Sequence, residues 1–358
     1  MTRSHHRKEL RGVVSRRRGF TMIDLLATIV IIGFLGALVL GAVGMARRQT
    51  QIRKTEYLID KLNKIMMTQY ESYRTRRVPM DLRAYVLAHK QGTAEPFYTV
   101  GNNYEYLPRE IARARVNAVR DLMRLEMPDR WSDIIHAGDP NTPDAVCLVL
   151  EHAPALTHRY RRIYLNSKAY STGNTKWGAA ECLYMIVMAI PGAAEQFRQS
   201  EVGDVDNDGL PEFHDAWGRP IRFLRWPSGF YYDPNYNYYG QSDIQFGPQS
   251  DQNKKYQADP FDSQGVMTSY QDGFAIYPLI YSAGPDGEFD INIGKVGKDT
   301  TYAYKLDDNG NINPFTTDGN NHQIGLPYNN DGDPSDSTSF YKDLRHYDNV
   351  TNQQQHGD

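Results

Sequence analysis

The longest uninterrupted apolar run in the chain is residues 20–43, FTMIDLLATIVIIGFLGALVLGAV, in which Asp24 is the single charged residue. A helix of this length reaches about 36 Å at ~1.5 Å per residue, and the hydrocarbon core of a bilayer is ~30 Å thick. The sequence contains no second run of this kind. It therefore predicts one membrane-spanning helix.

Residues 44–78 place apolar residues at three- and four-residue steps, which is the spacing of an amphipathic helix. The repeating positions are Ile52, Leu58, Ile59, Leu62, Ile65, Met66, Tyr70 and Tyr73. Because no proline occurs before Pro79, we expect one helix over 20–77. Its second half should pack this apolar stripe against a globular head.

Residues 79–200 are expected to be mainly helical and to form an insertion in the head. The segments 108–126 and 143–165 have helical apolar spacing. The apolar run within 178–190 is too short to span a membrane, so we assign it to the core.

Residues 201–290 change to strand and turn signals. The segments 220–232 and 273–283 are β-rich and punctuated by glycine and proline. Residues 233–272 and the polar C-terminal region 291–358 are expected to be loop-rich. The predicted fold class is α+β: a long N-terminal helix, then a head of inserted helices and a small antiparallel sheet.

Charge orients this arrangement. The net charge of −3 divides into +6 for residues 1–19, −1 for 20–43, +6 for 44–77 and −14 for 78–358. The basic leader directly before the apolar run predicts a cytoplasmic N-terminus and an outward head. A chain with a basic start and an acidic body does not fit a general nucleic-acid binder, so no nucleic acid is expected as a partner.

Two details at the start of the apolar run exceed what an ordinary uncleaved anchor requires. Gly19 lies at the polar–apolar boundary, after three arginines, and Asp24 lies inside the span, where an ionisable group costs ~2.5–3.5 kcal/mol. A secretory signal has a shorter apolar run of ~7–15 residues followed by its cleavage site. Here the run is longer, and Gly19 precedes it.

Residues 18–26, RGFTMIDLL, resemble the class III signal of type IV pilins and type II secretion pseudopilins. The resemblance implies a pilin-like version of the α+β fold, with cleavage after Gly19 by a prepilin peptidase and methylation of Phe20. Asp24 stands where the family usually has Glu. The resemblance implies that this carboxylate neutralises the amino group of a neighbouring subunit in a filament, which would remove the cost of an unpaired charge in hydrocarbon.

Residues 204–215, DVDNDGLPEFHD, carry acidic side chains at loop positions 1, 3, 5, 9 and 12, with glycine at position 6. This is the pattern of a calcium loop, in which hard oxygen ligands surround a sharp glycine turn. Position 12 departs from that pattern because it is Asp rather than the bidentate Glu, and Pro211 at position 8 has no N–H. The candidate ligands are Asp204, Asp206, Asp208, Glu212 and Asp215. A solvated acidic turn is the alternative.

Two further segments look like elements of the major type II secretion pseudopilin: residues 215–220, DAWGRP, and 281–287, YSAGPDG. In that family the second element opens a calcium loop, which makes Asp286 a further candidate ligand. Residues 348–351, DNVT, resemble the closure of that loop, although residues 292–347 intervene.

The resemblance implies a structural subunit of a type II secretion pseudopilus or a type IV pilus-like filament, in the cytoplasmic membrane with its head in the periplasm or extracytoplasmic space. The implied partners are copies of itself or other pilin-like subunits, the prepilin peptidase, an inner-membrane assembly platform and membrane lipid. The alternative is a membrane-tethered, calcium-binding extracytoplasmic protein that does not form filaments.

An enzyme is not expected, because the chain lacks a Gly-x-Ser-x-Gly elbow, a His-Glu-x-x-His motif, a Walker loop and a dinucleotide fingerprint. The two cysteines, Cys147 and Cys182, have no metal-type spacing. A disulfide and two separately buried thiols both remain open.

Overall fold

A computed structural model describes part of the chain, in two compact units made of residues 1–50 and 51–358. The described residues are 21–80, 97–100, 103–106, 108–135, 150, 153–174, 176–230, 259–266, 275–291, 293, 324–325 and 349–353.

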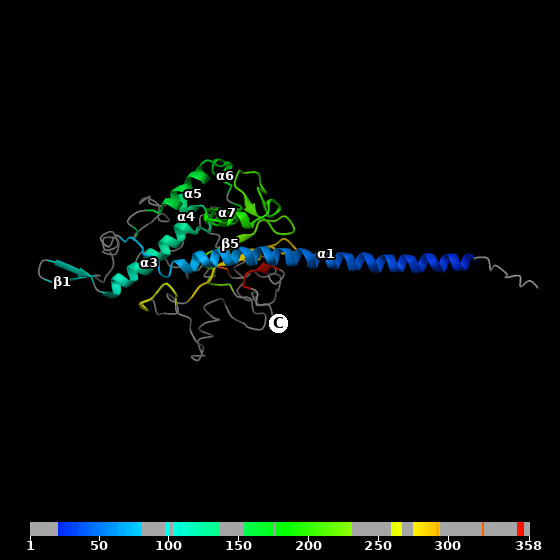
Figure 1. The fold of residues 1–358 in the computed structure, drawn as a ribbon, viewed down its shortest axis with the longest axis horizontal. Coiled ribbons are helices and arrows are strands. Elements are labelled where there is room, and N and C mark those ends of the chain that lie inside the picture. The colour runs from blue at the N-terminus through cyan, green and yellow to red at the C-terminus, as the bar shows by residue number, and fades with distance from the viewer. Residues whose placement is uncertain are drawn as a thin grey trace, which may run out of the picture. The chain divides into compact units, whose positions relative to one another are not determined.

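Helix α1, Met22–Ser72, is 51 residues long and begins in the first unit (Figure 1). Every residue from 22 to 50 is exposed, and this part is long and apolar enough to cross a membrane. The predicted apolar helix is thus confirmed by its length and composition.

The helix ends five residues before the predicted end at 77. Its last bonds are short-range, from the Tyr73 amide to the Tyr70 carbonyl and from the Arg74 amide to the Glu71 carbonyl. The Tyr73 hydroxyl then donates to Glu126 at 2.9 Å from a buried position. The helix thus ends in a tighter turn, and Tyr73 directly after it is held against the head.

In the second unit, residues 51–72 of α1 bury one face, as the apolar spacing predicts. The buried side chains are Thr55, Leu58, Ile59, Leu62, Met66 and Tyr70. The apolar ones among them join one hydrophobic cluster with apolar side chains of helix α3 (Pro108–Glu126) and of the strands. Helix α1 is therefore amphipathic only in its second half.

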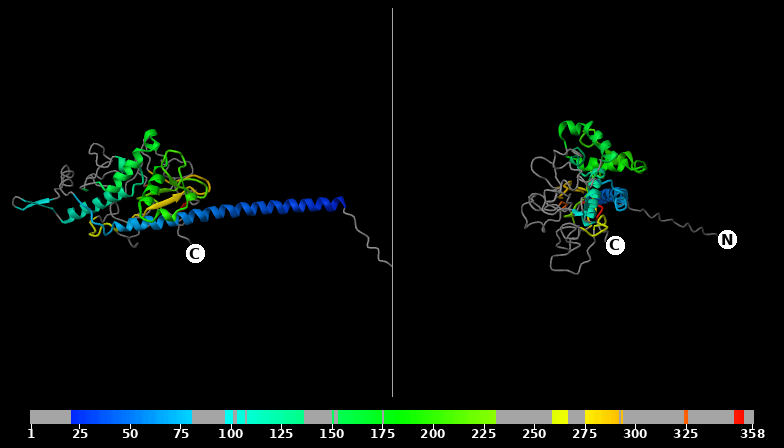
Figure 2. Two further views of the ribbon diagram at one scale, coloured as in Figure 1. Left: turned by 45° about the horizontal axis from the view of Figure 1, so that its top comes forward. Right: turned by 90° about the vertical axis from the view of Figure 1, so that its left-hand side faces the viewer.

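The helical block contains α3 (Pro108–Glu126), α4 (Ser132–Ile135), α5 (Ala155–Leu165), α6 (Lys168–Thr172), α7 (Gly178–Ala189) and the short 3₁₀ turns Ala194–Gln196 and Gln199–Glu201. Figure 2 shows these helices from two further sides. A hairpin of β1 (Phe97–Val100) and β2 (Asn103–Tyr106) precedes them.

Helix α3 spans the predicted 108–126, and within the predicted 143–165 the described residues are helical only from Ala155, while 143–149, 151 and 152 lie outside the described residues. Leu150 forms a bridge with Met80, and α5 begins only after Pro154, which lies outside the helix at its N-cap position. A residue that precedes proline is disfavoured in helical conformation, so Pro154 sets this boundary.

The strands are short and antiparallel. β3 (Val202–Gly203) pairs with β4 (Glu212–Phe213), and β5 (Arg222–Leu224), β6 (Leu279–Ser282) and β7 (Val350–Thr351) form a sheet in the order β5-β6-β7. β5 and β6 lie within the two predicted strand segments. The small antiparallel sheet and the α+β class are therefore confirmed, and α7 lies against β4 and β5.

A second hydrophobic cluster lies within the helical block. Its buried members are Trp131, Ile134, Tyr160, Tyr164, Ala169, Cys182, Met185 and Leu210. Burial raises the pKa of the Cys182 thiol, and Cys147 lies outside the described residues.

Buried Arg225, which directly follows β5, bonds to the helical block. Its guanidinium donates to the Met127 carbonyl at 2.7 Å and to Asp133 at 3.1 Å. The side chain of Arg225 is fully buried, so these contacts satisfy a charge that has no access to water.

Candidate metal centre

The acidic loop predicted from the sequence connects β3 to β4, and it is folded around Asp204. The Asp204 carboxylate accepts hydrogen bonds from the amides of Asp208 at 3.1 Å and Gly209 at 3.0 Å. Gly209 has a φ of 94°, a left-handed conformation that side chains with a Cβ rarely adopt. The glycine at loop position 6 therefore makes the sharp turn that the pattern predicts.

Two overlapping groups of carboxylates meet at this loop. Glu181, Asp206 and Asp208 form one group, and Asp204, Asp206 and Glu212 form the other. Within each group the oxygens lie within 4.8 Å of one another, and Asp206 belongs to both. The predicted ligands Asp204, Asp206, Asp208 and Glu212 are thus brought together.

Three buried carboxylate oxygens in these groups have no hydrogen-bond partner among the described residues: Oε1 of Glu181, Oδ1 of Asp206 and Oε1 of Glu212. Glu181 is 2% exposed and Glu212 is 0% exposed. A buried polar atom without a partner costs ~1–3 kcal/mol or more. Carboxylate oxygens are the donors that hard divalent cations such as Ca²⁺ prefer, so the residues present fit such an ion.

Burial and crowding also disfavour the ionised state of these groups. Burial, with the charges of Asp208, Glu212 and Asp206, raises the pKa of Glu181 to about 9, although the hydrogen bond from Trp131 opposes the shift. Burial and the neighbouring aspartates raise the pKa of Glu212 to about 7. A divalent cation would offset this repulsion.

Sequence reasoning missed Glu181. It lies in α7, 23 positions before the loop begins at Asp204, and no linear motif connects the two. The one available signal was an acidic residue directly before the apolar run of 182–190, on a helix that becomes buried.

Asp215 and Asp286 lie outside both groups. Asp215 accepts hydrogen bonds from the amides of Trp217 and Arg219, both at 2.9 Å, and from the Ser282 hydroxyl at 2.6 Å. Exposed Asp286 accepts from the Glu288 amide at 2.9 Å. Both carboxylates stabilise turns.

The two segments that resemble the major pseudopilin are in contact with each other. In addition to the Asp215–Ser282 hydrogen bond, Arg219 donates to the Gly284 carbonyl at 2.7 Å. Asn349, from the segment that resembles the loop closure, donates to the Phe289 carbonyl at 2.7 Å. Long-range contacts therefore join elements that are separate in the sequence.

At the other candidate site, Asp24 closes a capping arrangement on α1. Its Oδ2 accepts from the Thr21 amide at 3.1 Å and the Thr21 hydroxyl at 2.8 Å, and the Asp24 amide donates to the Thr21 hydroxyl at 3.2 Å. This is the reciprocal geometry of a capping box. The predicted processing residues Gly19 and Phe20 lie outside the described residues.

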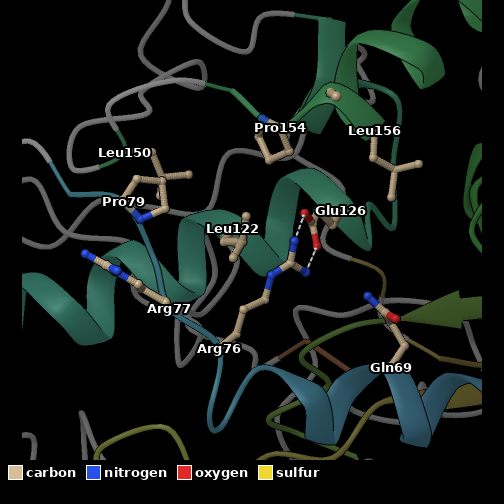
Figure 3. Close-up of a pocket in the computed structure, with 10 residues that line it drawn as sticks. Gln69, Arg76, Arg77, Pro79, Leu122, Glu126, Leu150, Pro154 and Leu156 are labelled. Carbon is tan, nitrogen blue, oxygen red and sulfur yellow. Dashed lines mark hydrogen bonds and ion pairs between the residues drawn. The ribbon is translucent and has the colours of Figure 1, made fainter.

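A cavity of about 430 Å³ lies between the chain after α1 and helix α3 (Figure 3). Glu126 projects into it and pairs with the guanidinium of Arg76, with one bond at 2.7 Å. Arg77 and Gln69 are further polar lining residues. The ion pair explains Glu126 as a structural link between the end of α1 and α3.

No protein-family model, curated protein or solved structure matches the chain.

Proposed function

We propose that this chain is a structural subunit of a pilin-like filament, either a type II secretion pseudopilus or a type IV pilus-like fibre. The observation that carries the proposal is the division of α1. Residues 22–50 are exposed and are apolar up to residue 43 apart from Asp24, whereas residues 51–72 bury a stripe in the head. One helix thus supplies both an unsatisfied apolar surface and a firm attachment to a folded unit.

The exposed half of α1 requires an apolar environment. Met22 is 91% exposed, Phe34 66% and Leu40 75%. A contiguous apolar surface of this kind is covered by lipid or by other proteins. Membrane lipid before assembly and neighbouring helices after assembly would both provide that cover. The basic leader and the motif at Gly19 support a sequence of events in which the leader is cleaved first and the chain then assembles. They also support a head outside the cytoplasm.

The capping arrangement at Asp24 is compatible with a role in assembly. Thr21 donates to Oδ2, whereas Oδ1 accepts no hydrogen bond from the described residues, so in this proposal Oδ1 would accept a neighbour's N-terminal ammonium. The pairing would remove the cost of a carboxylate in hydrocarbon. In this proposal the head has a structural rather than a catalytic role.

The acidic cluster is assigned to calcium. Its donors are carboxylate oxygens, and calcium accepts six to eight oxygen ligands in variable geometry. Extracytoplasmic modules bind calcium with dissociation constants of roughly 10⁻⁴–10⁻³ M. An extracytoplasmic head would therefore be occupied without a high-affinity site.

The test is assembly in cells that carry the cognate machinery, with surface filaments sheared off and the subunit quantified in the sheared and membrane fractions. Wild-type chain is expected in both fractions. Asp24→Ala should remain in the membrane fraction, because insertion no longer buries a carboxylate while the pairing is lost. Asp24→Glu is the matched control and should assemble.

A tethered protein that never assembles is the second candidate function, and it is favoured by the firm local satisfaction of Asp24 by Thr21. It predicts that the wild-type chain stays in the membrane fraction under the same conditions. It also predicts that Asp24→Ala behaves like wild type.

A further inference from the structure

The loop supplies one carboxylate ligand fewer than its sequence pattern predicts. The carboxylate of Asp215, at loop position 12, accepts hydrogen bonds from the Trp217 and Arg219 amides and the Ser282 hydroxyl. It lies outside the two carboxylate groups. A calcium loop normally receives a bidentate carboxylate from this position. The question is which residue takes its place.

We infer that Glu181 of helix α7 is a ligand of the cation held by the 204–212 loop, and that Trp131 positions it. This inference rests on the calcium site of the proposed function. It adds a ligand from outside the loop. It also assigns the cation a role in joining the helical block to the loop between β3 and β4.

The first support is the position of the Glu181 carboxylate. One of its oxygens lies within 4.8 Å of oxygens of both Asp206 and Asp208. The side chain is 2% exposed, and Oε1 has no hydrogen-bond partner among the described residues. This buried oxygen therefore faces the carboxylates of the loop without a hydrogen bond of its own.

The second support is the way in which Trp131 holds Glu181. The indole N–H donates to Oε2, so one oxygen is fixed and the other is left for the cation. The indole is itself stacked on Tyr164, with ring centroids 4.3 Å apart. Gly178, one turn before Glu181, admits the indole closely, since a Cβ there would lie 3.1 Å from Trp131 Cδ1.

A single cation accounts for both groups. Ligand oxygens lie 2.3–2.6 Å from Ca²⁺, so two oxygens on opposite sides of one ion are about 5 Å apart. The two groups share Asp206. Further bonds already link the loop to the helical block: the Lys168 amide donates to the Asp208 carbonyl at 2.8 Å, and Asn174 donates to Asp206 at 2.6 Å.

The experiment is calorimetric titration of the full chain in detergent micelles with Ca²⁺, after dialysis against a chelator. Wild type should bind one equivalent. Glu181→Gln keeps the shape and an acceptor for Trp131 but loses the charge, and should bind calcium at least about tenfold more weakly. Glu126→Gln is the matched control, because Glu126 is also buried in the helical block and lies outside the cluster. It should keep wild-type affinity.

Trp131 is tested as a positioning residue through a double-mutant comparison. Trp131→Phe keeps the aromatic ring and removes the N–H donor, and should weaken calcium binding about tenfold. In a Glu181→Gln background the same change should have no further effect on affinity. A merely structural Trp131 would lower affinity equally in both backgrounds.

The outcomes distinguish a failure of the calcium assignment from a failure of the Glu181 assignment. If wild type binds no calcium, the calcium assignment of the proposed function fails and this inference fails with it. If wild type binds calcium and Glu181→Gln binds it equally well, the calcium assignment stands and the inference is overturned. Binding of two equivalents by wild type would overturn the single shared cation.

Discussion

Asp206→Asn is expected to raise the stability of the head without calcium and to remove most of the stabilisation that calcium gives. Asp206 is the residue shared by the two carboxylate groups, and its Oδ1 is buried without a hydrogen-bond partner. The substitution keeps the size of the side chain and removes one negative charge. It therefore relieves repulsion in the empty site and removes a ligand from the occupied one.

The magnitude follows from the spacing of the oxygens. Two ionised carboxylate oxygens no more than 4.8 Å apart repel by about 3.5 kcal/mol at an effective dielectric constant of ~20. Partial protonation of Glu181 and Glu212 reduces this repulsion, so we expect a gain of ~1–3 kcal/mol for Asp206→Asn without calcium. For wild type, calcium at a hundredfold excess over Kd should add ~2.7 kcal/mol.

The assay is thermal unfolding of the full chain in detergent, followed by tryptophan fluorescence, in chelator and in excess calcium. One kcal/mol corresponds to ~2–4 °C for a large domain. Wild type should gain about 5–10 °C on addition of calcium. Asp206→Asn should unfold a few degrees above wild type in chelator and show little response to calcium.

Asp215→Asn is the control, because Asp215 belongs to the acidic run but its carboxylate binds Ser282 and two backbone amides. It should lower the midpoint in both conditions and retain the calcium response. The reasoning is refuted if Asp206→Asn lowers the midpoint in chelator and still responds to calcium as wild type does, since the cluster would then be a structural turn.

The same measurement has a defined pH dependence. Glu181 and Glu212 have raised pKa values in the folded chain, about 9 and about 7, so the calcium-free folded state binds more protons than the unfolded state above pH ~4.5. The stability of the calcium-free folded state should therefore fall as the pH rises from ~4.5 to about 9. Calcium binds the deprotonated carboxylates, so the calcium-induced shift should grow from pH 6 to pH 9. A shift independent of pH would exclude these two residues as ligands.

Two further substitutions test the attachment of α1 to the head. Leu62→Ala, at a fully buried position, should cost ~2–5 kcal/mol in chemical unfolding, whereas Tyr57→Ala, at a position 68% exposed on the same helix, should stay within ~0.5 kcal/mol; equal effects would contradict the burial of one face. Glu126→Gln should cost ~1–3 kcal/mol, because it weakens the bonds from Arg76 and Tyr73, and unchanged stability would show that this ion pair contributes nothing.

Much of the helical structure could be predicted because its apolar spacing is strong and local. Helix α3 matches the predicted 108–126, and the buried positions of α1 include Leu58, Leu62 and Met66, as expected. The end of α1 at Ser72 was not predicted, and the residues after it bond to a distant position: Tyr73 and Arg76 both bind Glu126, about fifty positions away.

The metal centre was predictable in its loop and not in its surroundings. Asp204, Asp206, Asp208 and Glu212 are close in sequence, and the glycine turn forces them together. Glu181 joins them only because α7 packs against β4 and β5, which is a consequence of the tertiary fold. The same fold keeps Asp215 outside the cluster, because the Asp215 carboxylate accepts a hydrogen bond from Ser282 of β6.

The most direct test of the central claim is the mass of the N-terminal peptide of the membrane-extracted chain from cells that contain a prepilin peptidase, compared with cells that lack it. The proposal predicts a chain that starts at Phe20 and carries one added methyl group on its amino terminus, and an intact leader when the peptidase is absent. A chain that starts at Met1 in both cells, or one cleaved after residue 43, would contradict the assignment to pilin-like filaments.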